Sequence, residues 1–352
     1  MKRGARNVLA GVTAVSLVFA ASVVHADAVE DFYTDRQVTM LLSTGAGGTY
    51  AAYAIAFAPH LANHIPGNPN IIVDYLPGAG GIRAMNYLYS SAPQDGSVIA
   101  IVHSSVPYAP LYGITAARFD SMQMNWIGGL NSTTGICVAW HESDIKTWDD
   151  LFDKEFFVGS TGAGSQMEIL PQMINKLFGT NITVIPGYIG GNDVFVAMER
   201  GEVDGRCGGL VSGINSTRPD WFPEKKVSIP VQIALERSPI FPDVPALGEF
   251  AKDEQTRQIL QLILSPMGMF GPMLAPPGVP ADRVAALRVA FHAAITDPAF
   301  IAAAQRIRIE VNEVDSDTLI GLITAAYAMP PAIVEAARDA MNLSGSTAGS
   351  GE

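Results

Sequence analysis

The same five residues, Ser-Thr-Gly-Ala-Gly, occur twice in this chain, at positions 43–47 and 160–164. Each copy follows a short apolar run and precedes a stretch that can form a helix. Glycine lets a backbone approach a ligand closely, and the first N–H groups of a helix are unpaired donors with partial positive charge. Two such turns could hold one carboxylate from both sides, or an extended dianion by its two ends.

Uncharged hydrogen-bonding side chains accompany both turns. The hydroxyls belong to Thr44, Thr49, Thr161 and Ser165, and two tyrosines, Tyr50 and Tyr188, lie at or near strand-end glycine turns. A tyrosine joins an apolar ring to a polar tip, which suits a carboxylated organic solute. The alternative is that the Gly-Ala turns only connect strands and helices, as such turns commonly do in a chain rich in both residues. The tyrosines would then lie in the core or at its rim.

The motifs of common enzymes are missing from the sequence. There is no G-x-x-x-x-G-K-[ST], GAGGTY lacks the last glycine of G-x-G-x-x-G, and the serine of GGLVSG lies one place from a G-x-S-x-G elbow. The histidines are scattered, and the cysteines lack zinc-ligand spacing. We therefore expect no catalytic centre, no metal and no cofactor. A formal net charge of −12 without a run of Lys and Arg also argues against nucleic acid as a partner.

Strand-like and helix-like runs alternate from Gln37 onward, which favours βαβ units and an α/β fold with mixed, mostly parallel sheets. The alternation restarts after the Gly- and Ser-rich stretch at 128–135, which we interpret as a crossover between two lobes. The predicted limits are 27–132 plus 263–342 for lobe one, 133–262 for lobe two, and 343–352 for a disordered tail. Ligands of open α/β sheets bind beyond the carboxyl ends of strands, where both repeated turns stand.

The N-terminus has the pattern of a secretory signal, with Lys2, Arg3 and Arg6 ahead of a short uncharged apolar run that ends in small residues. We expect residues 1–26 to be removed after Ala26 and the mature protein to reach the periplasm. An uncleaved N-terminal anchor, or a cut after Ala28, is the alternative. No cysteine stands near the cleavage site to carry a lipid.

The only two cysteines, Cys137 and Cys207, lie in runs that we expect to be strands or strand ends of lobe two. An even pair in an exported protein is compatible with one disulfide bond. Two buried free thiols are the alternative.

Several stretches carry a family pattern when they are taken in order. They are STGAGGTY, PGNPNIIVDYLPGAGGIRAMNYLYSSAPQDGS, GSTGAGSQMEILPQMINKLFGTNITVIPGYIGGNDVFVAMERGEVDG, FPDVPALGEF, and LAPPGVPADRVAALRVAF with DPAF. Together they resemble the extracytoplasmic solute receptors of tripartite tricarboxylate transporters, the Bug or TctC-like family. The resemblance covers residues from about 38 to 335, nearly the whole predicted mature chain.

This resemblance implies a two-lobed, type II-like Venus-flytrap fold and a non-enzymatic periplasmic receptor. Such a receptor delivers a small organic carboxylate, for instance a dicarboxylate or an aromatic acid, to integral-membrane transporter subunits, and we expect a monomer. It also implies that strand-to-helix loops of both lobes bind the acid, largely through backbone N–H groups. The predicted ligand-binding residues are Thr44, Gly45, Gly47, Gly48, Thr49, Tyr50, Ser104, Ser105, Thr161, Gly162, Gly164, Ser165, Gln166, Tyr188, Gly190 and Gly191.

The chain departs from its relatives at positions that bear on the ligand. Many relatives have an Asp and an Arg where this chain has Ala51 and Ile55, and a basic residue expected near 270–272 is missing. These departures favour an altered or more apolar ligand than citrate. The TAXI receptors of TRAP transporters share a Gly-rich GTY loop, but that family does not account for APPGVPADR or GYIGGND.

Two other functions remain open at this point. A periplasmic sensor subunit would need the same ligand-bound lobes and would present them to a signalling protein. An enzyme acting on a carboxylic acid would need a nucleophile, metal site or cofactor site that the sequence does not display.

Overall fold

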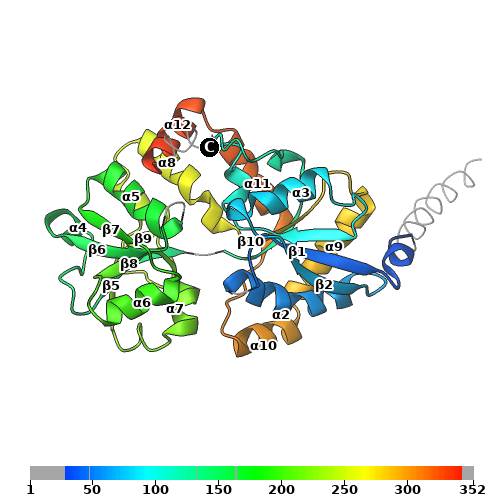
Figure 1. Ribbon diagram of the computed structural model, residues 1–352, viewed down its shortest axis with the longest axis horizontal. Helices are drawn as coiled ribbons and strands as arrows, with labels where there is room; N and C mark the ends of the chain where they lie inside the picture. Colours follow the sequence, from blue (N-terminus) through cyan, green and yellow to red (C-terminus); the bar gives the residue numbers. More distant parts are fainter. Residues whose placement is uncertain (1–27, 47, 133, 163–164, 343–352) are drawn as a thin grey trace, which may run out of the picture.

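The computed structural model describes residues 28–46, 48–132, 134–162 and 165–342 of the 352-residue chain. The predicted signal segment 1–26, the predicted tail 343–352, and Gly47 and Gly164 of the predicted site lie outside the described residues. The chain folds into two α/β lobes, each built around one sheet (Figure 1).

The first lobe contains a six-stranded sheet with the strand order β11-β4-β10-β3-β1-β2. Its strands are β1 (Gln37–Leu42), β2 (Asn70–Tyr75), β3 (Val98–Ile101), β4 (Asn125–Asn131), β10 (Phe270–Ala275) and β11 (Val314–Asp315). Strand β1 pairs parallel with β2 and β3, whereas β10 runs antiparallel between β3 and β4. The carboxyl ends of β1, β2 and β3 therefore meet at one edge of the sheet.

The second lobe contains a five-stranded sheet with the order β7-β6-β8-β5-β9. Its strands are β5 (Gly135–Trp140), β6 (Phe156–Ser160), β7 (Ile182–Pro186), β8 (Gly205–Leu210) and β9 (Val227–Ile233). Strand β6 pairs parallel with β7 and β8, and β5 pairs antiparallel with β8 and β9. Both sheets are thus mixed. The parallel pairs lie within the runs of alternating strands and helices, β1 to β3 in lobe one and β6 to β8 in lobe two. Each antiparallel pair includes a strand that adjoins a crossing between the lobes.

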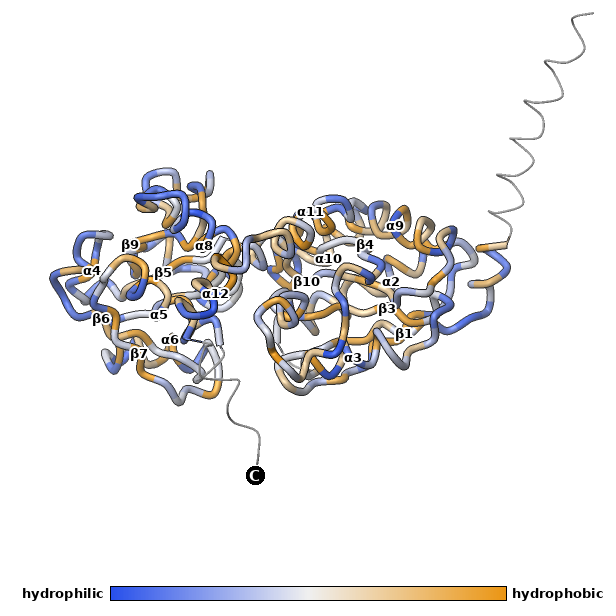
Figure 2. The backbone as a smooth tube through the Cα atoms, turned by 90° about the horizontal axis from the view of Figure 1, so that it is seen from above, coloured by the Kyte–Doolittle hydropathy of each residue, from blue (hydrophilic) through white to orange (hydrophobic). Residues whose placement is uncertain are grey.

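Helices pack on the sheets or on one another through their buried apolar residues. They are α2 (Thr49–His64), α3 (Ile82–Ser90), α4 (Asp150–Asp153), α5 (Gln166–Phe178), α6 (Gly191–Glu199), α7 (Val211–Thr217), α8 (Glu254–Leu264), α9 (Ala281–Ile295), α10 (Pro298–Arg306), α11 (Ser316–Tyr327) and α12 (Pro331–Ala340). In lobe one, Phe57 of α2 packs edge to face on Phe291 of α9 and Phe300 of α10. Figure 2 shows apolar segments through the interior and hydrophilic loops around α4 at the outer edge.

No single helix among the described residues is long and apolar enough to cross a membrane. Two bent pairs, α9 with α10 and α11 with α12, reach that length and composition only when the two helices of a pair are taken together.

The Gly-rich stretch at 128–135 contains the predicted crossover between the lobes, and the ends of β4 and β5 extend into it because its glycines make room for packed side chains. A Cβ on Gly128 of β4 would lie 2.3 Å from the Phe291 ring, and one on Gly135 of β5 would lie 2.7 Å from Met267 Cε. The chain passes from one sheet to the other between the end of β4 and the start of β5.

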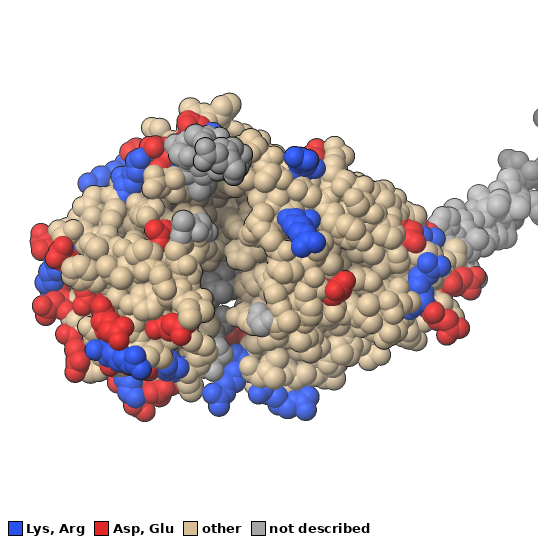
Figure 3. All heavy atoms as spheres, viewed as in Figure 1, with Lys and Arg blue, Asp and Glu red and all other residues tan. Residues whose placement is uncertain are grey.

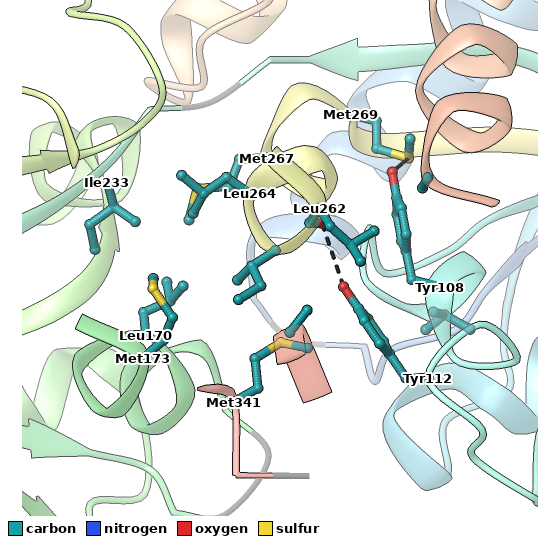
Figure 4. Packing of buried hydrophobic residues seen from close by; sticks show 14 of the residues in the cluster. Tyr108, Tyr112, Leu170, Met173, Ile233, Leu262, Leu264, Met267, Met269 and Met341 are labelled. Atoms are coloured by element: carbon teal, nitrogen blue, oxygen red, sulfur yellow. Dashed lines mark hydrogen bonds between the residues drawn. The ribbon is translucent and has the colours of Figure 1, made fainter. Parts of the chain in front are cut away.

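Buried residues connect the two lobes around α8 and the short 3-10 turn Ser265–Gly268 that follows it (Figure 4). Tyr112 donates a hydrogen bond from its hydroxyl to Leu262 O at 3.5 Å, and Tyr108 lies against Met269. The C-terminal helix α12, which the sequence assigns to lobe one, packs instead on α8 and on α5 of lobe two, burying Ile333 and Ala337. The other lobe limits, at 132/133 and 262/263, stay a prediction.

A disulfide bond joins Cys137 to Cys207 across the neighbouring strands β5 and β8. Both residues are fully buried and lie with Met173 and Ile174 of α5 in the same apolar cluster. Both cysteines are strand residues, as expected from their sequence runs.

Candidate ligand-binding site

A groove separates the two lobes in the space-filling view of Figure 3, and its walls on that face carry mostly uncharged residues. Three predicted site glycines stand beside open space: a Cβ added to Gly45, Gly48 or Gly162 would meet no atom within 4 Å. The lobes also touch, because Asn215 Nδ2 of α7 donates to Glu310 Oε1 of lobe one at 3.4 Å. We refer to the groove between the two lobes as the interlobe groove.

The first repeated turn leads from β1 into helix α2. Gly48 is the residue before the first helical turn and has φ 93°, a left-handed conformation that favours glycine. No side chain caps this end of α2, so the N–H groups of its first turn, which begins at Thr49, are not occupied by a capping side chain. The start of α2 is therefore a candidate position for an anion, and the predicted role of this turn in ligand binding stays a prediction.

Tyr50, in the first turn of α2, contacts the loop that follows β3. Its hydroxyl lies 3.0 Å from Ser104 Oγ and accepts a hydrogen bond from Ser104 N at 3.2 Å. Its ring stacks on the His103 ring with centroids 5.3 Å apart, and it also packs on Phe270. Burial raises the pKa of Tyr50 and lowers the pKa of His103, so both side chains are held in their neutral forms.

A second bridge joins the ends of β1 and β3. Ser43 Oγ accepts a hydrogen bond from His103 N at 2.8 Å, and His103 Nδ1 lies 2.9 Å from Ser105 Oγ. The next residue, Thr44, has a buried Oγ1 without a hydrogen-bond partner. A buried hydroxyl without a partner is costly, so Thr44 Oγ1 is a candidate for a ligand contact.

The second repeated turn leads from β6 into helix α5 and is held by a chain of hydrogen bonds. Gly162 N donates to Ser160 Oγ at 2.9 Å, and Ser160 Oγ donates to Glu168 Oε2 at 2.7 Å. Helix α5 begins at Gln166 after Ser165, whose side chain does not cap it. This chain fixes the turn while the first N–H groups of α5 remain without a side-chain cap.

The loop after β7 adjoins this turn. Tyr188 N donates to Ser160 O at 3.2 Å, which ties the two loops together, and the Tyr188 ring packs at the edge of the core of lobe two. Burial is the main cause of the raised pKa of Tyr188. Helix α6 begins at Gly191, and the residue before it, Gly190, provides no side-chain cap. Ile189 is 96% exposed.

The predicted site residues thus form one group in each lobe. Thr44, Gly45, Gly48, Thr49, Tyr50, Ser104 and Ser105 share the edge of the first sheet, and Thr161, Gly162, Ser165, Gln166, Tyr188, Gly190 and Gly191 share the edge of the second. Within the described residues, no hydrogen bond joins the first group to the second. The two residues of α2 at which this chain departs from many relatives differ in burial. Ala51 is buried in the core of lobe one, while Ile55 is 55% exposed.

The predicted set of ligand contacts leaves out four residues that the structure places at these loops. Ser43 and His103 connect β1 to β3, Glu168 holds the second turn, and Arg206 of β8 lies beneath Gly191. His103 directly precedes the predicted Ser104, and Arg206 is a lone cation in a strand, which were the available signals. Within the described ranges, no group of three or more His, Cys, Asp or Glu could hold a metal ion.

Two α/β lobes with uncapped helix starts on either side of a groove define a two-lobed solute-binding protein. The chain matches the model of the tripartite tricarboxylate transporter family receptor over residues 60–338, and it belongs to this family. A curated relative, the UPF0065 protein in the gbd 5′ region of Cupriavidus necator, is 27% identical over 299 residues, which cover 82% of this chain and 84% of the relative.

Solved structures share the fold. A TctC solute-binding protein from Polaromonas superposes with a TM-score of 0.66 at 18% identity, covering 86% of this chain and 99% of that one. MatC from Rhodopseudomonas palustris, solved with bound malate, superposes with a TM-score of 0.59 at 19% identity, covering 87% and 99%. The predicted α/β, two-lobed periplasmic-binding-protein fold is therefore confirmed, and the fold and family are those of solute receptors.

Proposed function

We propose that this protein is a periplasmic receptor that captures a small organic carboxylate in the interlobe groove and delivers it to a tripartite tricarboxylate-type membrane transporter. The observation that carries the proposal is the presence, in each lobe, of strand-to-helix loops whose helices begin without a side-chain cap beside the groove. Donors of this kind suit an anion and need no reacting group. Family membership and the malate bound to MatC support a carboxylate as the ligand.

The remaining parts of the proposal rest on the sequence. A signal segment at 1–26 would export the chain, and a monomer would suffice because both walls of the groove come from one chain. The ligand would contact the loop residues predicted above, on both lobes. The proposed receptor carries out no chemistry on its ligand.

A screen of carboxylates by thermal unfolding tests this proposal. The set should contain mono-, di- and tricarboxylates, aliphatic and aromatic, together with the neutral amide of each acid. A ligand at a hundred times its Kd stabilises the folded state by about 2.7 kcal/mol, which raises Tm by several degrees. Stabilisation by carboxylates and not by their amides supports the receptor. No response to any acid, or turnover of one of them, would contradict it.

A sensor subunit binds the same ligand, so binding alone does not separate it from a transport receptor. Uptake of the labelled acid by cells that contain or lack the gene separates the two. Loss of uptake on deletion supports delivery to a transporter. Unchanged uptake with a lost transcriptional response to the acid would favour the sensor.

A further inference from the structure

Arg206 is a charged side chain inside lobe two that forms no ion pair with any described carboxylate. Its guanidinium carbon lies 4.9 Å from the centre of the Phe195 ring, and Nη1 donates one long hydrogen bond of 3.4 Å to Gly191 O. Its Nε is buried without a hydrogen-bond partner. The residue as a whole is half-buried.

Arg206 lacks the close carboxylate partner that some other arginines of this chain have. Acidic residues outnumber basic ones by 34 to 22, and two other arginines make close pairs: Arg218 with Glu199 at 2.6 Å, and Arg237 with Glu249 at 2.7 Å. Burial lowers the pKa of Arg206 to about 10, which reflects the lack of a nearby anion to offset desolvation. A charge taken from water without a partner costs free energy that a bound anion would recover.

The position of Arg206 directs it toward the loop at the start of α6. A Cβ on Gly191, the first residue of that nine-residue helix, would lie 2.6 Å from Arg206 Nη1. Only glycine therefore allows the guanidinium to sit directly against the first turn. No side chain caps the start of α6, and the guanidinium contacts this first turn through Gly191 O. Asp193 N already donates to Gly190 O at 3.1 Å, so the N–H groups of the two preceding residues are the ones that could join the guanidinium in holding an anion.

We propose that Arg206 is the charged anchor for a carboxylate group of the ligand, which its free guanidinium N–H groups bind together with the first N–H groups of α6. This inference rests on the proposed receptor function and deepens it. Arginine's planar fork matches a carboxylate with two parallel hydrogen bonds and discriminates against the neutral amide. The acid end of the ligand then faces lobe two, and its other end meets the neutral Tyr50 and Ser104 of lobe one.

A purely structural role for Arg206 predicts a different outcome. Met has a similar length and no charge, so Arg206→Met removes the cation and largely keeps the packing on Phe195. Loss of a structural residue would lower the stability of the ligand-free protein and leave affinity unchanged once the protein is folded. Loss of a ligand anchor lowers affinity and leaves the ligand-free protein as stable as the parent, or more stable.

The test is calorimetric titration of the wild type, Arg206→Met and the control Arg200→Met with the best acid from the screen and with its amide. Arg200 follows the far end of the same helix α6, is exposed, and lies 3.7 Å from Glu202. We expect Arg206→Met to weaken binding of the acid by roughly tenfold to more than a hundredfold. The preference of the Arg206→Met protein for the acid over the amide should be smaller than that of the wild type by the same factor. Arg200→Met should bind like the wild type.

The outcomes separate the two proposals. If the wild type binds no carboxylate, the proposed function fails and this inference falls with it. If the wild type binds the acid and folded Arg206→Met binds it equally well, only the role of Arg206 is overturned.

A second measurement uses the wild-type protein and covers the case in which Arg206→Met does not fold. Arginine-directed chemical modification, read by peptide mass spectrometry, should be slowed at Arg206 by the acid and unchanged at Arg200. Equal modification of Arg206 with and without bound acid would overturn the inference.

Discussion

Tyr50 and Ser104 meet at the edge of the first sheet, with the tyrosine hydroxyl 3.0 Å from Ser104 Oγ and accepting the Ser104 N–H at 3.2 Å. Tyr50 belongs to the helix that follows β1, and Ser104 belongs to the loop that follows β3. Because β1 and β3 are adjacent and parallel, both loops leave the sheet at the same edge. One phenolic oxygen thus couples two loops of the proposed binding wall.

Replacing Tyr50 by Phe should loosen this coupling. The change removes the acceptor of the Ser104 N–H and leaves a buried donor without a partner, which costs about 1 to 3 kcal/mol. Urea unfolding measures the loss, and titration with the acid should show weaker binding. Tyr89→Phe is the control, because it removes an exposed hydrogen bond to Gln123 of 3.1 Å and should change stability by less than about 0.5 kcal/mol. A Tyr50→Phe protein as stable as the Tyr89→Phe protein would contradict the coupling.

A side chain at Gly45 should obstruct the ligand without harming the fold. A Cβ there meets nothing within 4 Å, and the residue does not have positive φ, so Gly45→Val places its side chain in open space. We expect nearly unchanged unfolding and at least about a tenfold loss of affinity, since one lost charge-assisted hydrogen bond costs roughly 1.5 to 3 kcal/mol. Gly321→Val, in equally open space on α11, is the control. Equal affinity of the two variants would exclude Gly45 from the site.

The unpartnered hydroxyl of Thr44 gives a prediction with opposite effects on stability and binding. Thr44→Val removes a buried polar group that has no partner in the ligand-free protein, so stability should stay constant or rise. If the ligand supplies the missing partner, affinity should fall by about twofold to tenfold. Thermal unfolding and titration of the same sample test both effects. A destabilised variant with unchanged affinity would show that the hydroxyl serves the fold alone.

The disulfide between Cys137 and Cys207 should contribute substantially to stability. The cysteines are 70 residues apart in sequence, and on the chain-entropy model a loop of this size stabilises the fold by roughly 4 kcal/mol. The double variant Cys137→Ala with Cys207→Ala should therefore unfold at a clearly lower denaturant concentration. Thiol titration of the unfolded, unreduced parent supplies the check on the bond itself. Two reactive thiols in that sample would refute it.

Acid should destabilise lobe one through His103. Burial lowers the pKa of this histidine in the folded state, while in the unfolded chain it titrates near pH 6.5. Below that value the unfolded chain binds the proton more readily, so the contribution present above about pH 6.5 is lost as the pH falls toward the folded pKa. Unfolding measured at pH 7.5 and pH 5 should show a smaller loss for His103→Gln than for the parent. An equal loss in both proteins would exclude His103 as a cause.

Much of the local structure at the candidate binding edge could be predicted because its signals are local. A glycine turn after an apolar run indicates where a strand ends and a helix begins, and α2, α5 and α6 do begin at Thr49, Gln166 and Gly191. The order of such turns also identified the family and its two-lobed fold. The 128–135 stretch does contain the passage from the first sheet to the second, but the strands extend into it, because glycine suits a strand that must accept the Phe291 ring as readily as it suits a loop.

The sequence by itself determined which residues are strand-end turns and which family the chain resembles, because backbone conformation follows from near neighbours. Only the tertiary structure decided which distant residues meet. Tyr50 contacts Ser104 because two parallel strands lie side by side. Arg206 contacts Gly191 because α6 covers β8. Helix α12 packs on α8 through its apolar face. These contacts depend on the packing of elements that are far apart in the chain, and a pattern of neighbouring residues does not encode that packing directly.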